Sequence, residues 1–564
     1  MNAAIKRIVM NTTKRSRLAV IIAGALGVAA ALTMGASAAS PRFYEDDPIW
    51  QERDTEDASG MKPLEVDLIV DLTTNLLARS AAGDARAQNV NTLGEGPDSS
   101  WFTNRAGRRP LTPGDVFIGP DTTPGPEPGT WTVTSSKSDG VTPGFTIKDT
   151  KGQLWFLKFD PPGYRGMATG TEVAVTKLMW ALGYHVPENH IAYMRRDQLV
   201  IADGAKFTPP GGTRRPMRID DLDTLLERAD REPDGAYRIV ASKALPGKPI
   251  GRVRFFDTRP DDPNDVVPHQ HRRELRAYGV FAAWLNHTDA KAINSLDTLI
   301  TENGRSFVRH HLLDFGSALG SAGVAPADYW EGSEYLIEPG DMVRQMMSFG
   351  FSFPKWHTTK FYEAPSIGRL PDDNTNFNPD LWKPRVPNQA FLHARADDKF
   401  WAAQKLMTLK TDLLRAAIRA GDFRDPKSEA FLARALAERR DAIGRAYLTA
   451  INPIVDPALD DDGVLTFRNA AVDADFAKAP GGYRAVWFRF DNATATSERI
   501  GETSGRTSRI EAPVGLPRRA GAFVKVQLSG VGALLPSWEK PIDVFFRYGD
   551  GQWRLAGVGR MPEA

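Results

Sequence analysis

The feature that most restricts the fold of this chain is a pair of strand-like segments joined by an Asn-Gly dipeptide. The segments cover residues 295–301 and 306–313, and the dipeptide is Asn303-Gly304. Asn-Gly strongly favours the two-residue turn of a β-hairpin. We therefore predict a hairpin in which Asn294 enters the first strand and Asp314 leaves the second, about equally far from the turn.

Equal distances from the turn would put Asn294 and Asp314 side by side at the open end of the hairpin. An amide oxygen and a carboxylate that converge are hard ligands, which suit Mg²⁺ or Mn²⁺ next to a phosphate. Asp289 and Lys291 lie on the loop just before and reach the same place. The alternative is a polar hairpin end at which Asp and Asn only cap the turn.

Three consecutive strands are predicted further upstream, at residues 131–133, 145–147 and 154–159. The third strand carries Lys158 on the same face as two apolar residues. A helix is expected next, because apolar residues recur at helical spacing before a glycine that can end it. These residues are Val175, Leu178, Met179 and Leu182, within a helix from about Gly170 to Leu182, and the glycine is Gly183.

The spacing D-x-K-x-x-N at Asp289, Lys291 and Asn294, followed by Asp314-Phe-Gly316, resembles the protein kinase superfamily. The resemblance implies that Asp289 accepts or orients the proton of an attacking hydroxyl and that Lys291 steadies the transferring phosphate. It implies that Asn294 and Asp314 hold the metal. The implied cofactors are ATP with Mg²⁺ or Mn²⁺.

The same resemblance assigns residues in the strands and the helix. Lys158 would reach the nucleotide phosphates and Glu172 would pair with it. The loop with Gly140 and Gly144 stands where backbone N–H groups would cover the phosphates, although it lacks the G-x-G-x-x-G pattern. Two alternatives stay open: Lys158 could extend to solvent, and Glu172 could belong to a capping box that begins at Thr169.

Several features depart from regulated kinases. Thr288 precedes Asp289 where many of them carry arginine, which argues against control by a phosphorylated activation loop. No A-P-E motif follows Gly316, and the stretch from Lys158 to Asp289 is long. The resemblance covers residues 130–450 and is similar in kind to the atypical bacterial HipA-like and CotH-like kinases. It implies an α+β, bilobal fold.

The chain is expected to contain several units. A second helix is predicted at 272–285, and residues 397–450 read as mainly helical. Short strands between Gly and Pro turns then indicate a separate small β domain, with strands near 485–490, 522–528 and 543–548. The predicted units are a signal peptide (1–38), an irregular N-terminal extension (39–128), an N-lobe (129–245), a helical C-lobe (246–450) and a C-terminal β-rich domain (451–564).

The first 38 residues have the anatomy of a secretory leader. Five basic residues precede an apolar stretch from Leu18 to about Met34, and Ala36-Ser-Ala38 is a small-residue cleavage pattern. We expect an exported protein, periplasmic or extracellular, with an uncleaved N-terminal anchor as the alternative. No further membrane span is expected. Removal of the leader leaves 66 basic and 70 acidic residues, a net charge of −4, so nothing favours nucleic acid as a partner.

Other chemistries have weaker support. The chain has no cysteine, which excludes disulfides and thiolate sites. His269-Gln-His271 and the acidic run Asp257–Asp265 are interpreted as solvated loops, and His310-His311 would point to opposite faces of a strand. The sequence therefore favours a kinase-like phosphotransferase that acts on a hydroxyl of a protein, sugar or lipid. A catalytically inactive binding protein of kinase shape and a nucleotidyl (AMP) transferase are the alternatives.

Overall fold

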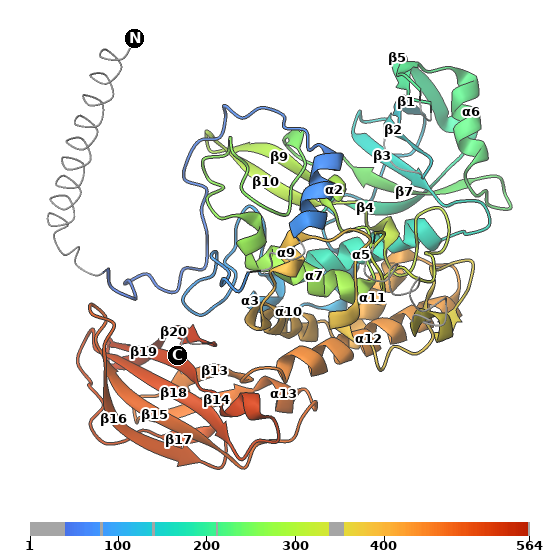
Figure 1. The fold of residues 1–564 in the computed structure, drawn as a ribbon. Coiled ribbons are helices and arrows are strands. Elements are labelled where there is room, and N and C mark those ends of the chain that lie inside the picture. Colours follow the sequence, from blue (N-terminus) through green and yellow to red (C-terminus); the bar gives the residue numbers. More distant parts are fainter. Residues whose placement is uncertain (1–39, 79–82, 138–141, 210–211, 338–354, 562–564) are drawn as a thin grey trace, which may run out of the picture.

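The computed structural model describes residues 40–78, 83–137, 142–209, 212–337 and 355–561 (Figure 1). The predicted leader and Gly140 lie outside these ranges. Helices and sheets are mixed along the chain, as expected for an α+β protein. Within the described ranges, every helix is too short or too polar to cross a membrane.

The first large element is a seven-stranded sheet. All neighbouring strands are antiparallel except the parallel pair β1 and β5. The three predicted consecutive strands are confirmed as β1, β2 and β3, and their alternate side chains form a separate apolar core. The order across the sheet is β4 (Asn189–Met194), β7 (Tyr237–Lys243), β3 (Leu154–Phe159), β2 (Gly144–Lys148), β1 (Trp131–Ser136), β5 (Leu199–Phe207) and β6 (Arg215–Pro216).

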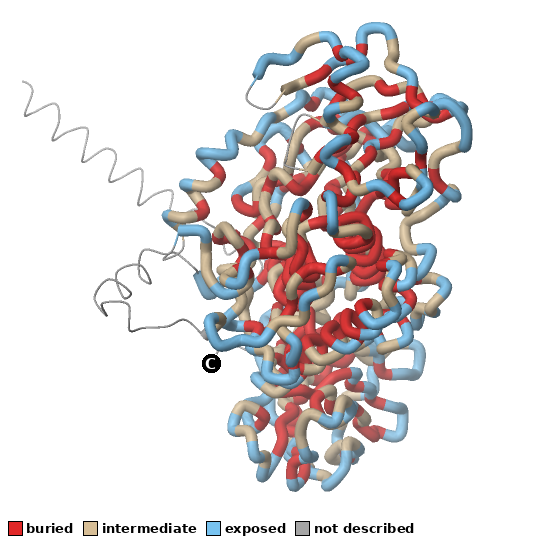
Figure 2. The backbone as a smooth tube through the Cα atoms, turned by 90° about the vertical axis from the view of Figure 1, so that its right-hand side faces the viewer, coloured by how far each residue is buried: buried red, intermediate tan, exposed pale blue. Residues whose placement is uncertain are grey.

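Helix α5 (Met167–Leu182) follows β3 and packs against the sheet. It begins three residues before the predicted start and ends as predicted at Gly183, whose φ of 121° suits glycine. Fifteen of its 16 residues are buried, so this helix is enclosed on all sides. Figure 2 shows the buried segments gathered in the interior of the molecule, with exposed turns around them.

A helical half carries the largest apolar core. The predicted helix at 272–285 is confirmed as α7, and residues 397–450 are mainly helical as expected. The principal helices are α7 (Arg273–Leu285), α10 (Ala396–Thr408), α11 (Thr411–Gly421) and α12 (Pro426–Leu448). The short helix α9 (Gln389–Leu392) packs against α7, and the short helix α6 (Ile219–Glu227) belongs to the core of the sheet. Two-stranded β11 (Phe361–Tyr362) and β12 (Leu370–Pro371) form a small separate ribbon.

The stretch upstream of the sheet is less irregular than expected. It contains α2 (Leu68–Leu77), α3 (Arg105–Arg108) and α4 (Pro113–Ile118), and Trp101 and Phe102 enter the helical core. The amphipathic segment near 66–78 does form helix α2. Its apolar residues Leu68, Ile69, Val70 and Leu77 are nevertheless exposed, so its apolar positions do not build a core.

The predicted hairpin is confirmed as β9 (Ser295–Glu302) and β10 (Arg305–Leu312), and β8 (Lys248–Gly251) pairs with β9. Asn303 and Gly304 have φ values of 53° and 76°, as the turn requires. The register pairs Ser295 with Leu312. Asn294 therefore lies across from Leu313, whose N–H donates to its carbonyl at 3.0 Å, and Asp314 is one residue further on.

The C-terminal part forms two packed sheets around a core that includes Trp487 and Phe546. The strands predicted near 485–490, 522–528 and 543–548 are confirmed as β15, β18 and β19. One sheet contains β13 (Ile454–Leu459), β14 (Val464–Asn469) and β17 (Arg509–Glu511), and the other contains β16 (Ser497–Gly505), β15 (Gly482–Phe490), β18 (Phe523–Val531), β19 (Ile542–Gly549) and β20 (Gln552–Gly559). The turn of helix α13 (Ala470–Asp473) joins them.

The beginning of the described chain is attached to this C-terminal part. The ring of Phe43 is buried among Phe490, Phe523 and Phe545, with ring centroids 5.1–6.1 Å apart. Asn492 holds the backbone of Phe43 by accepting from its N–H at 2.8 Å and donating to its carbonyl at 2.7 Å. The two ends of the described chain are thus joined by packing and hydrogen bonds.

The acidic run at 257–265 is not the solvated loop that we predicted. Asp262 and Asp265 are buried, and Asp265 accepts a hydrogen bond at 2.7 Å from His269, which is buried as well. Burial is possible because His269 and the backbone N–H of Arg259 supply the donors that water would otherwise supply. On β10, His310 contacts Asp297 while His311 contacts the Leu296 carbonyl, so the two imidazoles are separate, as predicted.

Candidate active site

Lys158 connects three segments that are far apart in the sequence. Its Nζ donates to Glu172 Oε2 at 3.0 Å and to Asp314 Oδ1 at 2.8 Å. Burial alone would lower the pKa of the Lys158 ammonium, but the charges of Asp314 and Glu172 outweigh burial and raise that pKa above its usual value. Lys158 is therefore a fixed cation between two carboxylates, and it does not extend to solvent.

Strand β3 presents Lys158 away from the apolar core of the sheet. Trp155, Leu157 and Phe159 fill that core, whereas Phe156 on the face of Lys158 is 46% exposed. The two apolar residues that share a face with Lys158 thus do not mark a buried core. The alternation of the strand instead directs Lys158 toward α5 and the Asp314 loop.

Glu172 is held by more than its lysine. Its carboxylate accepts from the backbone N–H of Phe315 and of Gly316, each at 3.0 Å, and it is 2% exposed. The capping-box alternative is wrong, because the helix begins at Met167 and the Thr169 hydroxyl bonds to Asp160 instead. Glu172 therefore fixes the Asp-Phe-Gly backbone and the lysine together.

The loop before the hairpin forms a second polar group around Asp289. Asn294 donates its side-chain N–H to the Asp289 carbonyl at 2.7 Å and to Asp289 Oδ2 at 2.9 Å. Lys291 lies 2.7 Å from Asp289 Oδ1. Three of the residues singled out from the sequence are therefore in direct contact, and both oxygens of the Asp289 carboxylate are oriented.

The predicted side-by-side placement of Asn294 and Asp314 is shifted by one residue. Asp314 adopts a left-handed backbone conformation with φ 57° and ψ 60°, so it has left the strand ladder. Its carboxylate bonds to Lys158, whereas the nitrogen of Asn294 bonds to Asp289. The sequence analysis treated residues 294 and 314 as equally far from the turn, whereas the turn at 303–304 pairs 294 with 313.

His287 lies between the two polar groups. Its ring is fully buried next to Phe315, and its Nδ1 faces the Ser317 carbonyl at 3.2 Å. Burial lowers the pKa of this imidazole, opposed by the charges of Asp289, Asp314 and Glu172. The carboxylates of both polar groups therefore act electrostatically on this one imidazole ring.

A narrow cleft opens onto this region. Its lining includes Lys158, Glu172, Asp314 and Gly316, together with Thr142, Thr169, Val240 and Gly323. A larger pocket of about 230 Å³ lies between Tyr164 and the segment from Glu363 to Arg369. None of the residues singled out from the sequence lines that larger pocket, whereas Lys158, Glu172 and Asp314 line the narrow cleft.

The donor set fits a hard divalent cation only in part. Asn294 uses its nitrogen as a donor, which leaves its amide oxygen as an acceptor, and Asp314 has a second carboxylate oxygen. Among the described residues there is no group of three or more His, Asp or Glu side chains that could hold a metal by themselves. Two oxygen ligands suit Mg²⁺, which keeps water and phosphate oxygens in its remaining positions.

Gly144 has a packing role. It lies across from Lys158 in the β2–β3 ladder, and a Cβ on it would come 2.3 Å from the Leu157 carbonyl oxygen. The neighbouring Lys137 also belongs here, since its charge assists Lys158 in lowering the pKa of Asp314 against the opposing effect of burial. Lys137 was not singled out from the sequence, because it stands outside any motif.

An ion pair between half-buried Arg385 and buried Glu331 supports the Asp289 loop. Arg385 donates to Glu331 twice, at 2.7 and 2.8 Å, and its Nη1 lies 3.9 Å from Asp289 Oδ1. The Thr288 hydroxyl donates to the same Glu331, and the Arg385 N–H donates to the Thr288 carbonyl. Sequence reasoning missed both charged residues, because only the tertiary fold brings them to the loop.

No family model and no curated protein matches the chain. Among solved structures, it is similar to a proinflammatory kinase of Helicobacter pylori, CtkA, with 12% identity over 54% of this chain and 94% of that chain and a TM-score of 0.26. It is also similar to the golgi casein kinase, with 12% identity over 71% of this chain and 94% of that chain and a TM-score of 0.28. Likenesses this low do not assign an activity.

Proposed function

We propose that this chain is a kinase-like phosphotransferase that uses ATP and Mg²⁺ or Mn²⁺ to phosphorylate a hydroxyl. One observation carries the proposal: Lys158 contacts both Glu172 on α5 and Asp314 of the Asp-Phe-Gly segment. Phosphoryl transfer depends mainly on positioning and charge neutralisation. A fixed cation between two carboxylates, at the edge of a cleft, supplies both the positioning and the charge neutralisation.

The arrangement of elements supports the same proposal. Helix α5 connects β3 to β4, and β7 lies between those two strands in the sheet. The sheet and the helical half have separate apolar cores, and the ion pairs of Lys158 lie where the two halves meet. We infer a bilobal kinase-like architecture in which the nucleotide lies in the cleft beside Lys158.

The residues around Asp289 can take the proton from the acceptor hydroxyl and stabilise the group that is transferred to it. The acceptor hydroxyl attacks the γ-phosphorus, its proton passes to the Asp289 carboxylate, and the bond from the γ-phosphorus to the leaving ADP oxygen breaks. Asn294 and Lys291 keep that carboxylate oriented in advance. Lys291 also places a positive charge where charge builds up on the transferring group.

Lys158 binds the nucleotide phosphates, and Glu172 keeps it in place. Asn294 and Asp314 would hold the divalent cation through the amide oxygen and a carboxylate oxygen. When bound, this cation neutralises phosphate charge. Asp314 now bonds to Lys158, so nucleotide binding is expected to divide the contacts of these two side chains between phosphate and metal.

We further propose an exported protein, periplasmic or extracellular, that acts on a hydroxyl of a protein, sugar or lipid. The basic start and apolar stretch of residues 1–38 support export. The two-sheet C-terminal part contributes no residue to the cleft, and we propose it as the element that contacts the acceptor or the envelope.

The test uses the chain without residues 1–38. A rise in melting temperature with ATP and Mg²⁺ or Mn²⁺ is expected, since ligand binding stabilises the folded state. Incubation with labelled ATP and a cell-envelope extract should then transfer label from the γ position. The absence of a shift at millimolar nucleotide would favour a kinase-shaped binding protein, and a product that carries AMP in mass spectrometry would favour nucleotidyl transfer.

A further inference from the structure

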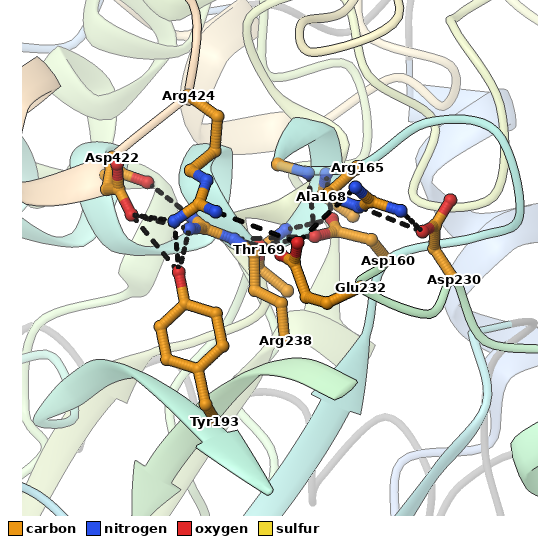
Figure 3. Close-up of polar contacts among 12 residues, drawn as sticks. Asp160, Arg165, Ala168, Thr169, Tyr193, Asp230, Glu232, Arg238, Asp422 and Arg424 are labelled. Carbon is orange, nitrogen blue, oxygen red and sulfur yellow. Dashed lines mark hydrogen bonds and ion pairs between the residues drawn. The ribbon is translucent and has the colours of Figure 1, made fainter. Parts of the chain in front are cut away.

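Asp160 lies several residues before helix α5 in the sequence, yet its side chain caps the N-terminus of that helix. Its carboxylate is 1% exposed and accepts from the backbone N–H groups of Gly166 at 2.8 Å and of Ala168 and Thr169, each at 2.9 Å (Figure 3). It also accepts from the Thr169 hydroxyl at 2.7 Å. The N-cap residue Gly166 has no side chain to cap the helix, so Asp160 satisfies the first-turn donors instead.

Arg238 extends this contact to the helical half. From β7, its buried guanidinium donates through Nε to the Thr169 hydroxyl at 2.9 Å and lies 3.6 Å from Asp160. Its other nitrogens donate to the Gly421 carbonyl at 2.7 Å and to Asp422 at 2.8 Å, at the end of α11 (Figure 3). One buried cation therefore joins the sheet, α5 and α11.

The backbones of α5 and α11 also touch. A Cβ on Gly170 would lie 2.8 Å from the Gly421 carbonyl, and a Cβ on Gly421 would lie 2.6 Å from the Gly170 carbonyl. Both helices lack a side chain at the point of closest approach. Any displacement of α5 relative to α11 therefore breaks buried polar contacts as well as packing.

We infer that Asp160, Thr169, Arg238 and Asp422 form a clamp that positions the Lys158–Glu172 pair. Asp160 stands two residues after Lys158, and Thr169 stands one helical turn before Glu172. The hydrogen bonds between Asp160 and Thr169 thus fix strand and helix next to the ion pair, and Arg238 fixes both against the helical half. The clamp keeps the pair assembled without an outside partner; its catalytic consequence rests on the proposed function.

The test compares three variants of the leaderless chain. Arg238→Met removes the central cation, Thr169→Val removes the hydroxyl that joins Asp160 to Arg238, and Arg165→Met is the matched control. Arg165 belongs to the neighbouring charge cluster, but its guanidinium makes its hydrogen bonds and ion pairs with Asp230, the Arg231 carbonyl and Glu232. If Arg238→Met fails to fold, Thr169→Val carries the test.

Two readouts do not depend on catalysis. Hydrogen exchange of the Ala168 and Thr169 amides, and acylation of Lys158 by an amine-reactive ester, should each accelerate about tenfold or more when the clamp is broken. Arg165→Met should match the parent chain. A folded Arg238→Met or Thr169→Val variant with parental exchange and acylation would overturn the inference.

Activity measurements separate the two proposals. If phosphotransfer occurs, the clamp variants should show a raised KM for ATP and a lower kcat, whereas Arg165→Met keeps both parameters. A parent chain that transfers no phosphate, but whose Lys158 becomes reactive in the clamp variants, would contradict the proposed function and leave the clamp supported.

Discussion

Lys158 and Asp314, 156 residues apart in the sequence, are joined by a hydrogen bond of 2.8 Å. The bond brings the middle of the seven-stranded sheet to the segment that follows the hairpin. Glu172 holds the same lysine and the backbone after Asp314, so three parts of the chain converge on one ammonium group.

Replacement of the central lysine should remove activity while the fold remains. Lys158→Met leaves Glu172 and Asp314 without their shared cation, and we expect phosphotransfer to fall on the order of a hundredfold or more. Label transfer from γ-labelled ATP measures the effect. Lys151→Met is the control, because Lys151 pairs with Glu127 on an exposed turn. Full activity in Lys158→Met would refute the assignment.

Arg385 should matter for turnover more than for nucleotide binding. Arg385→Met removes the side chain that pairs with Glu331 and approaches Asp289, without touching the cleft beside Lys158. We expect a drop in kcat of about tenfold or more with little change in KM for ATP. Arg215→Met is a matched control, since Arg215 makes the same two-bond contact with Asp221, which is also buried. An equal loss in both variants would argue against a role at Asp289.

Gly144 should tolerate no side chain. Gly144→Ala places a Cβ against the Leu157 carbonyl, next to Lys158 in the ladder, and should cost about 1–3 kcal/mol of unfolding free energy. Thermal unfolding provides the measurement. Gly60→Ala, at a position with open space around it, should leave the melting temperature unchanged. A stable Gly144→Ala variant would mean that β2 and β3 are further apart than described.

Stability should decrease in mild acid. Burial lowers the pKa of His185 to about 3 and that of His311 to about 4, from a usual value of 6.5. Below pH 6.5 the two imidazoles become protonated in the unfolded chain but stay unprotonated in the folded chain. The free energy of unfolding therefore falls as the pH drops toward 4. Denaturant unfolding at several pH values tests this. His185→Gln should reduce the slope below pH 6.5, and an unchanged slope would exclude His185 as its source.

Phe43 should stabilise the C-terminal β domain. Phe43→Ala empties an aromatic site among Phe490, Phe523 and Phe545 and should cost about 3–5 kcal/mol. Limited proteolysis should show earlier cleavage within residues 482–559. Tyr44→Ala changes the next residue, whose ring is 54% exposed, and should behave like the parent chain.

Local signals accounted for much of the fold. The apolar spacing of Val175, Leu178 and Met179 predicted a helix, and Asn303-Gly304 predicted the hairpin turn. Both predictions were possible because helix periodicity and turn type depend on residues that are close together in the sequence. The predicted Lys158–Glu172 contact is present in the structure. The start of α5 was missed, since its cap, Asp160, comes from the preceding strand end and not from the helix sequence.

Contacts between residues that only the tertiary fold brings together could not be predicted from local sequence patterns. The burial of Asp265 depends on His269, and the position of Arg385 depends on Glu331, which lies far from it in sequence. The shift of Asp314 relative to Asn294 arises from one left-handed residue after the strand. Each of these depends on a partner or a backbone angle that no short pattern specifies.

The attachment of Phe43 to the C-terminal sheet has a mechanical consequence. A tether joined to the chain upstream of Arg42 would transmit force into the sandwich of residues 454–559, through the hydrogen bonds of the Asn492 side chain and carbonyl to the backbone of Arg42 and Phe43. None of these attachment residues lines the cleft beside Lys158, so a tether at this point would not pull directly on a residue of that cleft.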